Sequence, residues 1–159
     1  MKIWTLLTPI LVAAAPAAAQ VMAPPEYVAN AGASDLYERT SSQLVLETTS
    51  DPRVRSFAEM MIAHHTQSTA DVAAAAADAG LAAPPPRLNP LQTELVAQLQ
   101  AEQGAARDLA YIAQQKAAHG QALNIHKAYA MDGTEAPLRT AAAQIVPVVQ
   151  SHIEMLKTM

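Results

Sequence analysis

The chain of 159 residues carries 10 Lys and Arg against 14 Asp and Glu, a formal net charge of −4, and it contains no cysteine. This length suits one domain with a single core, the acidic balance argues against a nucleic-acid partner, and the lack of cysteine excludes disulfides and a lipidated cysteine. Hydrophobic residues make up 51% of the chain and aromatic residues only 4%. The alanine- and leucine-rich composition predicts an all-α protein.

The N-terminal residues have the organisation of a secretory signal peptide. Lys2 supplies a positive charge, residues 3–12 form a short apolar run, and Ala17-Ala18-Ala19 precedes Gln20 as a cleavage site of small residues. The apolar run is too short to span a bilayer as a helix. We therefore expect residues 1–19 to be removed on export, residues 20–26 to be a flexible start of the mature chain, and the location to be periplasmic, either free or associated with the outer membrane.

Proline and glycine divide the rest of the chain into five predicted helices. Asp51 can cap a helix that has Pro52 at its first position, and Gly80 is a natural stop for the same helix. The run Ala82-Ala83-Pro84-Pro85-Pro86 must be extended. The predicted helices cover residues 27–49, 52–79, 91–100, 105–131 and 135–157.

The four long helices predict a bundle built from two helical hairpins. The turns within the hairpins are short, whereas the connector between them, from Gly80 to about Gln103, is long enough to return along a bundle of about 40 Å. We therefore expect residues 27–158 to form a ferritin-like up-down four-helix bundle with a Pro-rich crossover that contains a short extra helix.

Polar residues occupy positions where the helical spacing predicts core. His65, His119 and His152 lie on the apolar stripes of three different helices, and Glu38 lies on the small-residue face of the first helix. Counting residues from the adjoining turns places all four about 20–27 Å from a turn, near the middle of the bundle. The sequence therefore predicts a polar layer at mid-height.

Two explanations of this layer remain open. Imidazole and carboxylate groups suit zinc, iron or copper, with His65, His119 and His152 as ligands and Glu38 as a fourth ligand or an outer partner. Alternatively, the same groups form a buried hydrogen-bonded network that fixes the helix register. A ferritin-type di-iron centre is improbable, because such bundles use Glu-x-x-His pairs and no histidine here has a glutamate three residues earlier.

Four further polar residues receive structural interpretations. His64 points about 100° away from His65 and is expected at the boundary or surface. His126 lies two turns from His119 and could extend the polar layer, but an exposed helix end is our first expectation. Asp108 and Tyr111, three residues apart, are expected to form a structural pair near the end of the bundle.

Several motifs together resemble one bacterial exported family. The N-terminal half contributes Tyr27-Val28, Ala31 and Glu38, followed by Pro52-x-Val54-x-x-Phe57-Ala58-x-x-Met61-Ile62-x-x-His65. The C-terminal half contributes Gly104-Ala105-Ala106-x-Asp108-x-x-Tyr111, then His119, and Val146-Pro147 followed by His152. This pattern, from about Tyr27 to Leu156, resembles the family catalogued as domain of unknown function 4142, often labelled a predicted outer-membrane protein.

The resemblance implies a ferritin-like helical fold. It also implies recurring polar positions at Glu38, His65, Asp108, Tyr111, His119 and His152. The chain departs from the pattern at His64, where the family usually has an aspartate, and at Arg107, where an aromatic residue normally stands. The first departure removes a carboxylate beside His65.

No strong catalytic motif is present, so our first functional expectation is a non-catalytic binding or envelope-associated module. The alternative is a metal-binding or redox protein that holds one zinc, iron or copper ion at the histidines and Glu38. A membrane-surface role for the amphipathic segment 91–100 is a third hypothesis, but this segment contains no basic residue. Substrate, partner and oligomeric state do not follow from the sequence.

Overall fold

The structure, a computed structural model, describes residues 22–159, and this part of the chain contains five helices and no strand. The predicted signal peptide, residues 1–19, lies outside the described residues. The helices are α1 (Pro24–Leu46), α2 (Pro52–Asp78), α3 (Pro90–Ala101), α4 (Gly104–Asp132) and α5 (Ala136–Leu156).

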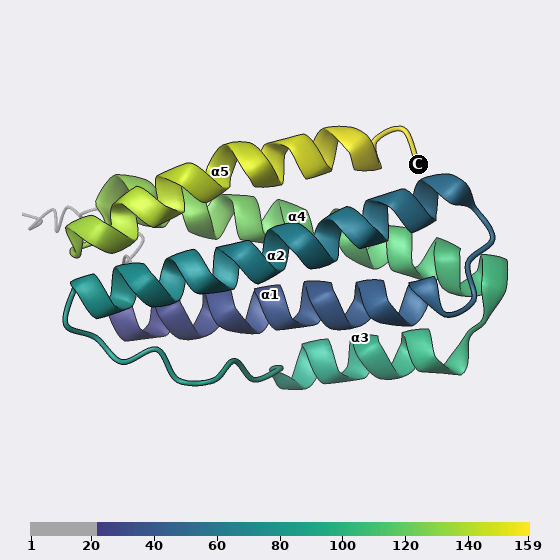
Figure 1. Cartoon of the computed structure of the whole chain (residues 1–159), viewed down its shortest axis with the longest axis horizontal. Coiled ribbons are helices and arrows are strands. Elements are labelled where there is room, and N and C mark those ends of the chain that lie inside the picture. The colour runs from purple at the N-terminus through teal and green to yellow at the C-terminus, as the bar shows by residue number, and fades with distance from the viewer. Residues whose placement is uncertain (1–21) are drawn as a thin grey trace, which may run out of the picture.

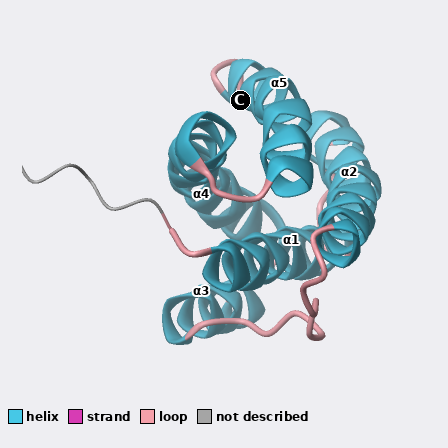
Figure 2. Ribbon diagram, turned by 90° about the vertical axis from the view of Figure 1, so that its left-hand side faces the viewer, coloured by secondary structure: helices cyan, strands magenta, loops and turns pink. Residues whose placement is uncertain are grey.

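The long helices form a four-helix bundle made of two hairpins, α1–α2 and α4–α5, as the sequence predicts (Figure 1). Helices α1 and α5 run in one direction and α2 and α4 in the other. The connector after α2 returns along the length of the bundle, and α3 lies outside it, packed against α1 and α4 (Figure 2). This crossover fixes which faces of the two hairpins meet.

Local sequence signals place the ends of several helices. The Asp51 side chain accepts a hydrogen bond from the backbone N–H of Arg53 at 2.8 Å, which satisfies one free donor at the start of α2. Asn89 and Gln92 form a reciprocal capping box at the start of α3. Gly80 follows α2 with a φ of 70°, a left-handed conformation that favours glycine at this position.

The first helix begins earlier than expected. Residues 24–26, which we assigned to a flexible segment, form the first turn of α1, because Pro24 and Pro25 occupy early helical positions that need no N–H donor. At the other end the helix stops at Leu46 instead of Thr49. The remaining predicted boundaries differ from the observed ones by at most one residue.

The core consists of two apolar clusters that lie at different heights of the bundle. We call them the Tyr129 cluster and the Met61 cluster. The Tyr129 cluster includes Tyr27, Val28, Val72, Tyr129, Leu138 and Val149. The Met61 cluster includes Val45, Phe57, Met61, Leu99, Tyr111 and Leu156. On every long helix, the polar positions of the predicted layer fall between members of the two clusters.

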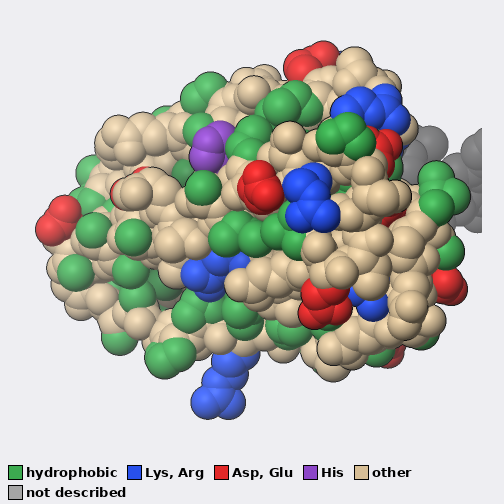
Figure 3. Space-filling model, turned by 45° about the vertical axis from the view of Figure 1, so that its right-hand side comes forward, with side chains coloured by type: hydrophobic (Ala, Val, Ile, Leu, Met, Phe, Trp, Pro, Cys, Tyr) green, Lys and Arg blue, Asp and Glu red, His purple; other side chains and the backbone are tan. Residues whose placement is uncertain are grey.

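One face of the molecule shows how the charged side chains are distributed on it. On the face drawn in Figure 3, acidic and basic side chains are dispersed among hydrophobic and other groups instead of gathering in one patch. Among residues 22–159, no helix combines the length and the apolar character that crossing a membrane requires.

Candidate metal centre

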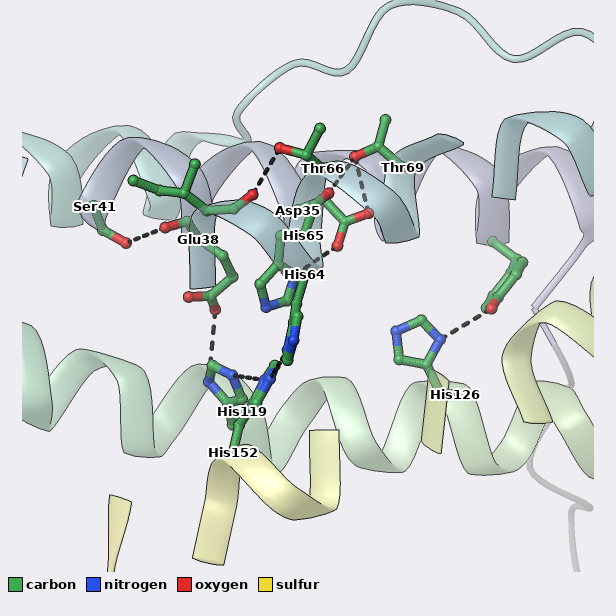
Figure 4. A network of polar contacts seen from close by, with 12 residues as sticks. Asp35, Glu38, Ser41, His64, His65, Thr66, Thr69, His119, His126 and His152 are labelled. Carbon is green, nitrogen blue, oxygen red and sulfur yellow. Dashed lines mark hydrogen bonds and ion pairs between the residues drawn. The ribbon is translucent and has the colours of Figure 1, made fainter. Parts of the chain in front are cut away.

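Three imidazoles from three helices meet in the middle of the bundle. His65 on α2, His119 on α4 and His152 on α5 are all buried, and one ring nitrogen of each lies within 4.8 Å of those of the other two (Figure 4). Each residue lies on the inward stripe of its helix, between the Tyr129 cluster and the Met61 cluster. The structure thus brings together the three histidines that the sequence placed in a single layer.

The outer nitrogen of each ring is held by a specific group. His65 Nδ1 lies 2.7 Å from Asp35 Oδ1, a carboxylate of α1. His119 Nδ1 donates to the carbonyl oxygen of Gln115 at 2.9 Å, one turn earlier on α4. Because a carbonyl only accepts, this bond puts a proton on Nδ1 and leaves the lone pair on Nε2 of His119.

His152 is held from the surface side. Its Nε2 lies 2.8 Å from Nδ1 of His64, which is exposed and whose ring stacks on that of His152. Its Nδ1 therefore faces inward and lies 3.2 Å from Nε2 of His119. Two nitrogens bound tetrahedrally to one zinc ion at the usual bond length are about 3.3 Å apart, so this separation suits either a direct hydrogen bond or two metal ligands.

The third inward nitrogen has no hydrogen-bond partner. His65 Nε2 is buried, and no acceptor or donor in the described part of the chain bonds to it. The inward set is therefore Nε2 of His65, Nε2 of His119 and Nδ1 of His152. Buried polar atoms are nearly always satisfied, so this nitrogen is the exception among the three inward nitrogens.

Glu38 lies beside the histidines, on the outer side of His119. Its Oε1 is 3.8 Å from His119 Nδ1, the nitrogen already bonded to Gln115, and its Oε2 is buried without a hydrogen-bond partner within residues 22–159. Burial raises the pKa of Glu38 to about 7, although the nearby His65 opposes the rise. This position makes Glu38 an outer neighbour of the three-histidine group.

Burial also controls the protonation of the imidazoles. Burial, helped by the charge of neighbouring histidines, lowers the pKa of His119 to about 4 and that of His152 to about 3. For His65, burial lowers the pKa, but the hydrogen bond to Asp35 and the charge of Glu38 outweigh it, so the net pKa is raised. Two of the three rings are thus neutral at pH 7, the form that binds metals.

A cavity of about 160 Å³ adjoins the histidines and opens between α2 and α5. All three inward histidines line it, together with Asp35 and Glu38. The rest of its wall is formed by Ser34, His64, Gln67, Ser68, Asp71, Ala122, His126, Ala141, Gln144, Ile145, Val148 and Val149. The cluster is therefore buried but not sealed from solvent.

A comparison with known protein families finds one family whose sequence model covers the whole bundle. The sequence model of domain of unknown function 4142 (DUF4142) matches residues 11–159, which include all five helices and every residue of the cluster. The chain belongs to this family. No curated protein and no solved structure matches the chain. Since the DUF4142 description names no activity, the chemistry of the site must be argued from its residues.

Other polar residues of this DUF4142 chain make their contacts outside the three-histidine group, although His126 also lines the cavity. His126, expected at an exposed helix end, is instead buried and lies 2.9 Å from the hydroxyl of Tyr27, because α1 and α4 pack closely at that height. Burial lowers the pKa of His126 to about 4. His126 thus has a different environment from the other four histidines, and Figure 4 shows it apart from them.

The expected pairing of Asp108 with Tyr111 is wrong. Asp108 accepts a hydrogen bond from the Thr49 hydroxyl at 2.9 Å and so ties α4 to the turn after α1. The Tyr111 hydroxyl lies 2.7 Å from that of Ser42 on α1. Both residues are buried near one end of the DUF4142 bundle, but each faces a different partner across the helix interface.

Sequence reasoning missed two residues of the cluster. Asp35 lies three residues before Glu38, so helical spacing puts both on one face, and this spacing could have identified it. His64 is exposed as predicted, yet its ring reaches back to His152 on the neighbouring helix. Position 64 thus holds an imidazole that contacts His152, and Asp35 supplies the carboxylate to His65.

Proposed function

We propose that this DUF4142 protein binds one transition-metal ion, zinc, iron or copper, through His65, His119 and His152. The unsatisfied Nε2 of His65 is the single observation that carries this proposal. It faces two other imidazoles, each of which has its outer nitrogen held by another group. Metal-bound histidines commonly show this arrangement, since the outer bond fixes the ring and the tautomer.

The main competing interpretation is a structural hydrogen-bond network. In such a network every buried donor and acceptor is paired. A chain of bonds from His64 through His152 and His119 to the Gln115 carbonyl meets this requirement. His65 does not, because its inward nitrogen is left over. A metal ion bonded to that nitrogen would complete the set, and this difference favours metal binding.

We further propose that the protein binds its metal in the periplasm. The N-terminal pattern of a positive residue, an apolar run and small residues before Gln20 supports export. The binding-module hypothesis and the metal hypothesis then describe the same molecule, an exported bundle whose ligand is an ion. Mass spectrometry of protein from the periplasm should find a mature chain that begins near Gln20.

Metal titration of the mature chain tests the proposal. After treatment with a chelator, the protein should bind zinc or copper at one equivalent, and its Tm should rise as the metal concentration increases. His65→Gln should weaken the affinity at least about 100-fold, the upper range for loss of a residue that supports a metal ligand. His126→Gln is the matched control, because His126 is exposed to 5% and His65 to 7%, but only His65 belongs to the cluster.

The proposal would be refuted by an unchanged Tm with all three metals and no retained ion. It would also be refuted if His65→Gln and His126→Gln, both folded by circular dichroism, bound metal as well as the parent chain. In either case the histidine layer would be a structural network only.

A further inference from the structure

We propose that the metal centre keeps one open coordination position that faces the cavity between α2 and α5, where it takes a small uncharged donor ligand. This inference rests on the proposed metal binding and adds a second ligand to it. The chemical class we assign is a neutral molecule with one lone-pair donor atom and a small apolar body, such as a heteroaromatic amine.

The number of protein ligands leaves room for such a molecule. The cluster offers three inward nitrogens, from α2, α4 and α5. Closed structural zinc sites have four protein ligands, whereas sites with three keep a position for an exogenous ligand. On α1, Asp35 is held by His65 and Thr69, and the Glu38 carboxylate lies toward the outer nitrogen of His119. Neither side chain is placed as the fourth ligand.

The cavity provides access to that position. All three inward histidines line the cavity, so a ligand within it can approach the metal directly. A volume of about 160 Å³ holds several water molecules or one small organic molecule, given about 30 Å³ for a liquid water. At its mouth, His64, Gln67 and Gln144 are exposed, and Val148 is 38% exposed. Solvent therefore reaches the entrance.

The charge of the wall selects an uncharged ligand. None of the described residues that line the cavity is a lysine or arginine, whereas Asp35, Glu38 and Asp71 are acidic. Asp71 at the mouth accepts a hydrogen bond from Gln67 at 2.8 Å. An anion would have to pass this acidic entrance, where no lysine or arginine of the lining attracts it, at a cost in affinity.

The apolar part of the wall also favours an uncharged ligand. Ala122, Ala141, Ile145 and Val149 also line the cavity. Ligand pockets commonly combine an apolar lining with a few polar groups that fix orientation. Here the polar groups are the metal and its histidines, so the ligand needs one donor atom and otherwise an apolar surface.

A cobalt-substituted protein tests this inference. The mature chain loaded with Co²⁺ is titrated at about pH 8 with imidazole, which is then mostly uncharged, and separately with azide, while the visible absorption of the cobalt is followed. Imidazole should change the spectrum to saturation. For each probe, the concentration at half-saturation is measured, and the value for azide is divided by the value for imidazole. The same ratio is measured for Co²⁺ in a three-nitrogen chelate in solution. The ratio for the protein should be larger by about 10-fold or more, which corresponds to about 1.4 kcal/mol.

A variant at the mouth provides the structural control. Ser68→Leu adds a bulky side chain to the cavity wall and should weaken imidazole binding about 10-fold or more, with cobalt still retained after desalting. Thr66→Leu is the matched control, since Thr66 is on the same helix and exposed but does not line the cavity. It should leave the imidazole titration unchanged.

The possible outcomes separate the two proposals. If cobalt binds at one equivalent but neither probe changes its spectrum, the metal site is closed and only this inference fails. If azide binds as readily as the chelate ratio predicts, or if Ser68→Leu and Thr66→Leu behave alike, the assigned ligand class or entrance is wrong. If no cobalt binds, the proposed function fails, and this inference fails with it.

Discussion

Acid should destabilise the metal-free protein, because three buried histidines stay uncharged in the folded chain. Burial lowers the pKa of His119 and His126 to about 4 and that of His152 to about 3. The ordinary value is 6.5. Between about pH 6.5 and 4 the unfolded chain therefore binds protons at these three positions that the folded chain does not bind, and the free energy of unfolding falls with falling pH.

Glu38 has the opposite effect on the pH dependence of stability, because it releases a proton when the chain unfolds. Burial raises the pKa of Glu38 from 4.5 to about 7, so at about pH 5.5 the folded chain holds a proton there that the unfolded chain has mostly lost. His65 has a raised pKa and is charged at this pH in both states. Three protons gained on unfolding and one released leave a net uptake of about two. At about 1.4 kcal/mol per proton and pH unit, the free energy of unfolding should fall by about 2–3 kcal/mol per pH unit near pH 5.5.

Urea unfolding of the chelator-treated mature chain at several values between about pH 5 and 6 measures this slope. His126→Gln removes one of the three histidines without touching the cluster, so it should reduce the net uptake to about one proton and roughly halve the slope. A free energy of unfolding that stays constant or rises on acidification over this range would contradict the reasoning, because it would mean that the buried imidazoles already carry protons in the folded state.

Two further substitutions have expected results. Asp35→Asn keeps the shape of the side chain but removes the charge beside His65, and it should weaken metal affinity about 10–100-fold in a competition titration. Asp71→Asn at the cavity mouth is the control and should change the affinity far less. If the two variants bind metal with equal affinity, Asp35 does not support the site. Gly133→Ala would place a Cβ 2.6 Å from atoms of Tyr129 and should lower the free energy of unfolding by about 1–3 kcal/mol. Gly120→Ala is the control, because its Cβ would meet no atom within 4 Å. It should not lower the free energy of unfolding in the same urea assay.

The bundle and its crossover could be predicted because their signals are local and redundant. Pro52, Gly80 and the three prolines at 84–86 mark boundaries that also agree with the helical spacing of the apolar residues. The exception was the start of α1. There Pro24 and Pro25 occupy the first turn of the helix, a position that suits proline, whereas we expected the helix to start at Tyr27.

The composition of the polar layer could be predicted only in part. Helical spacing placed His65, His119 and His152 on inward stripes, and counting from the turns placed them at one height. Spacing along one helix does not say which partner faces a side chain from another helix. For this reason His126 and Tyr27, separated by 99 positions in the sequence, could not be matched, and the contact of exposed His64 with His152 was missed.

The polar layer of histidines interrupts the apolar core of the bundle. The Tyr129 cluster and the Met61 cluster lie on either side of the histidines, so the polar layer divides what could be one continuous apolar core. Burying imidazoles and carboxyl groups costs free energy even when they are hydrogen-bonded, and His65 Nε2 and Glu38 Oε2 are not bonded at all. Hydrogen bonds alone therefore do not account for this arrangement. If an ion binds as proposed, it supplies a partner for His65 Nε2 and stabilises the folded state through its affinity for that state. The nitrogen that weakens the metal-free bundle would then stabilise the loaded one.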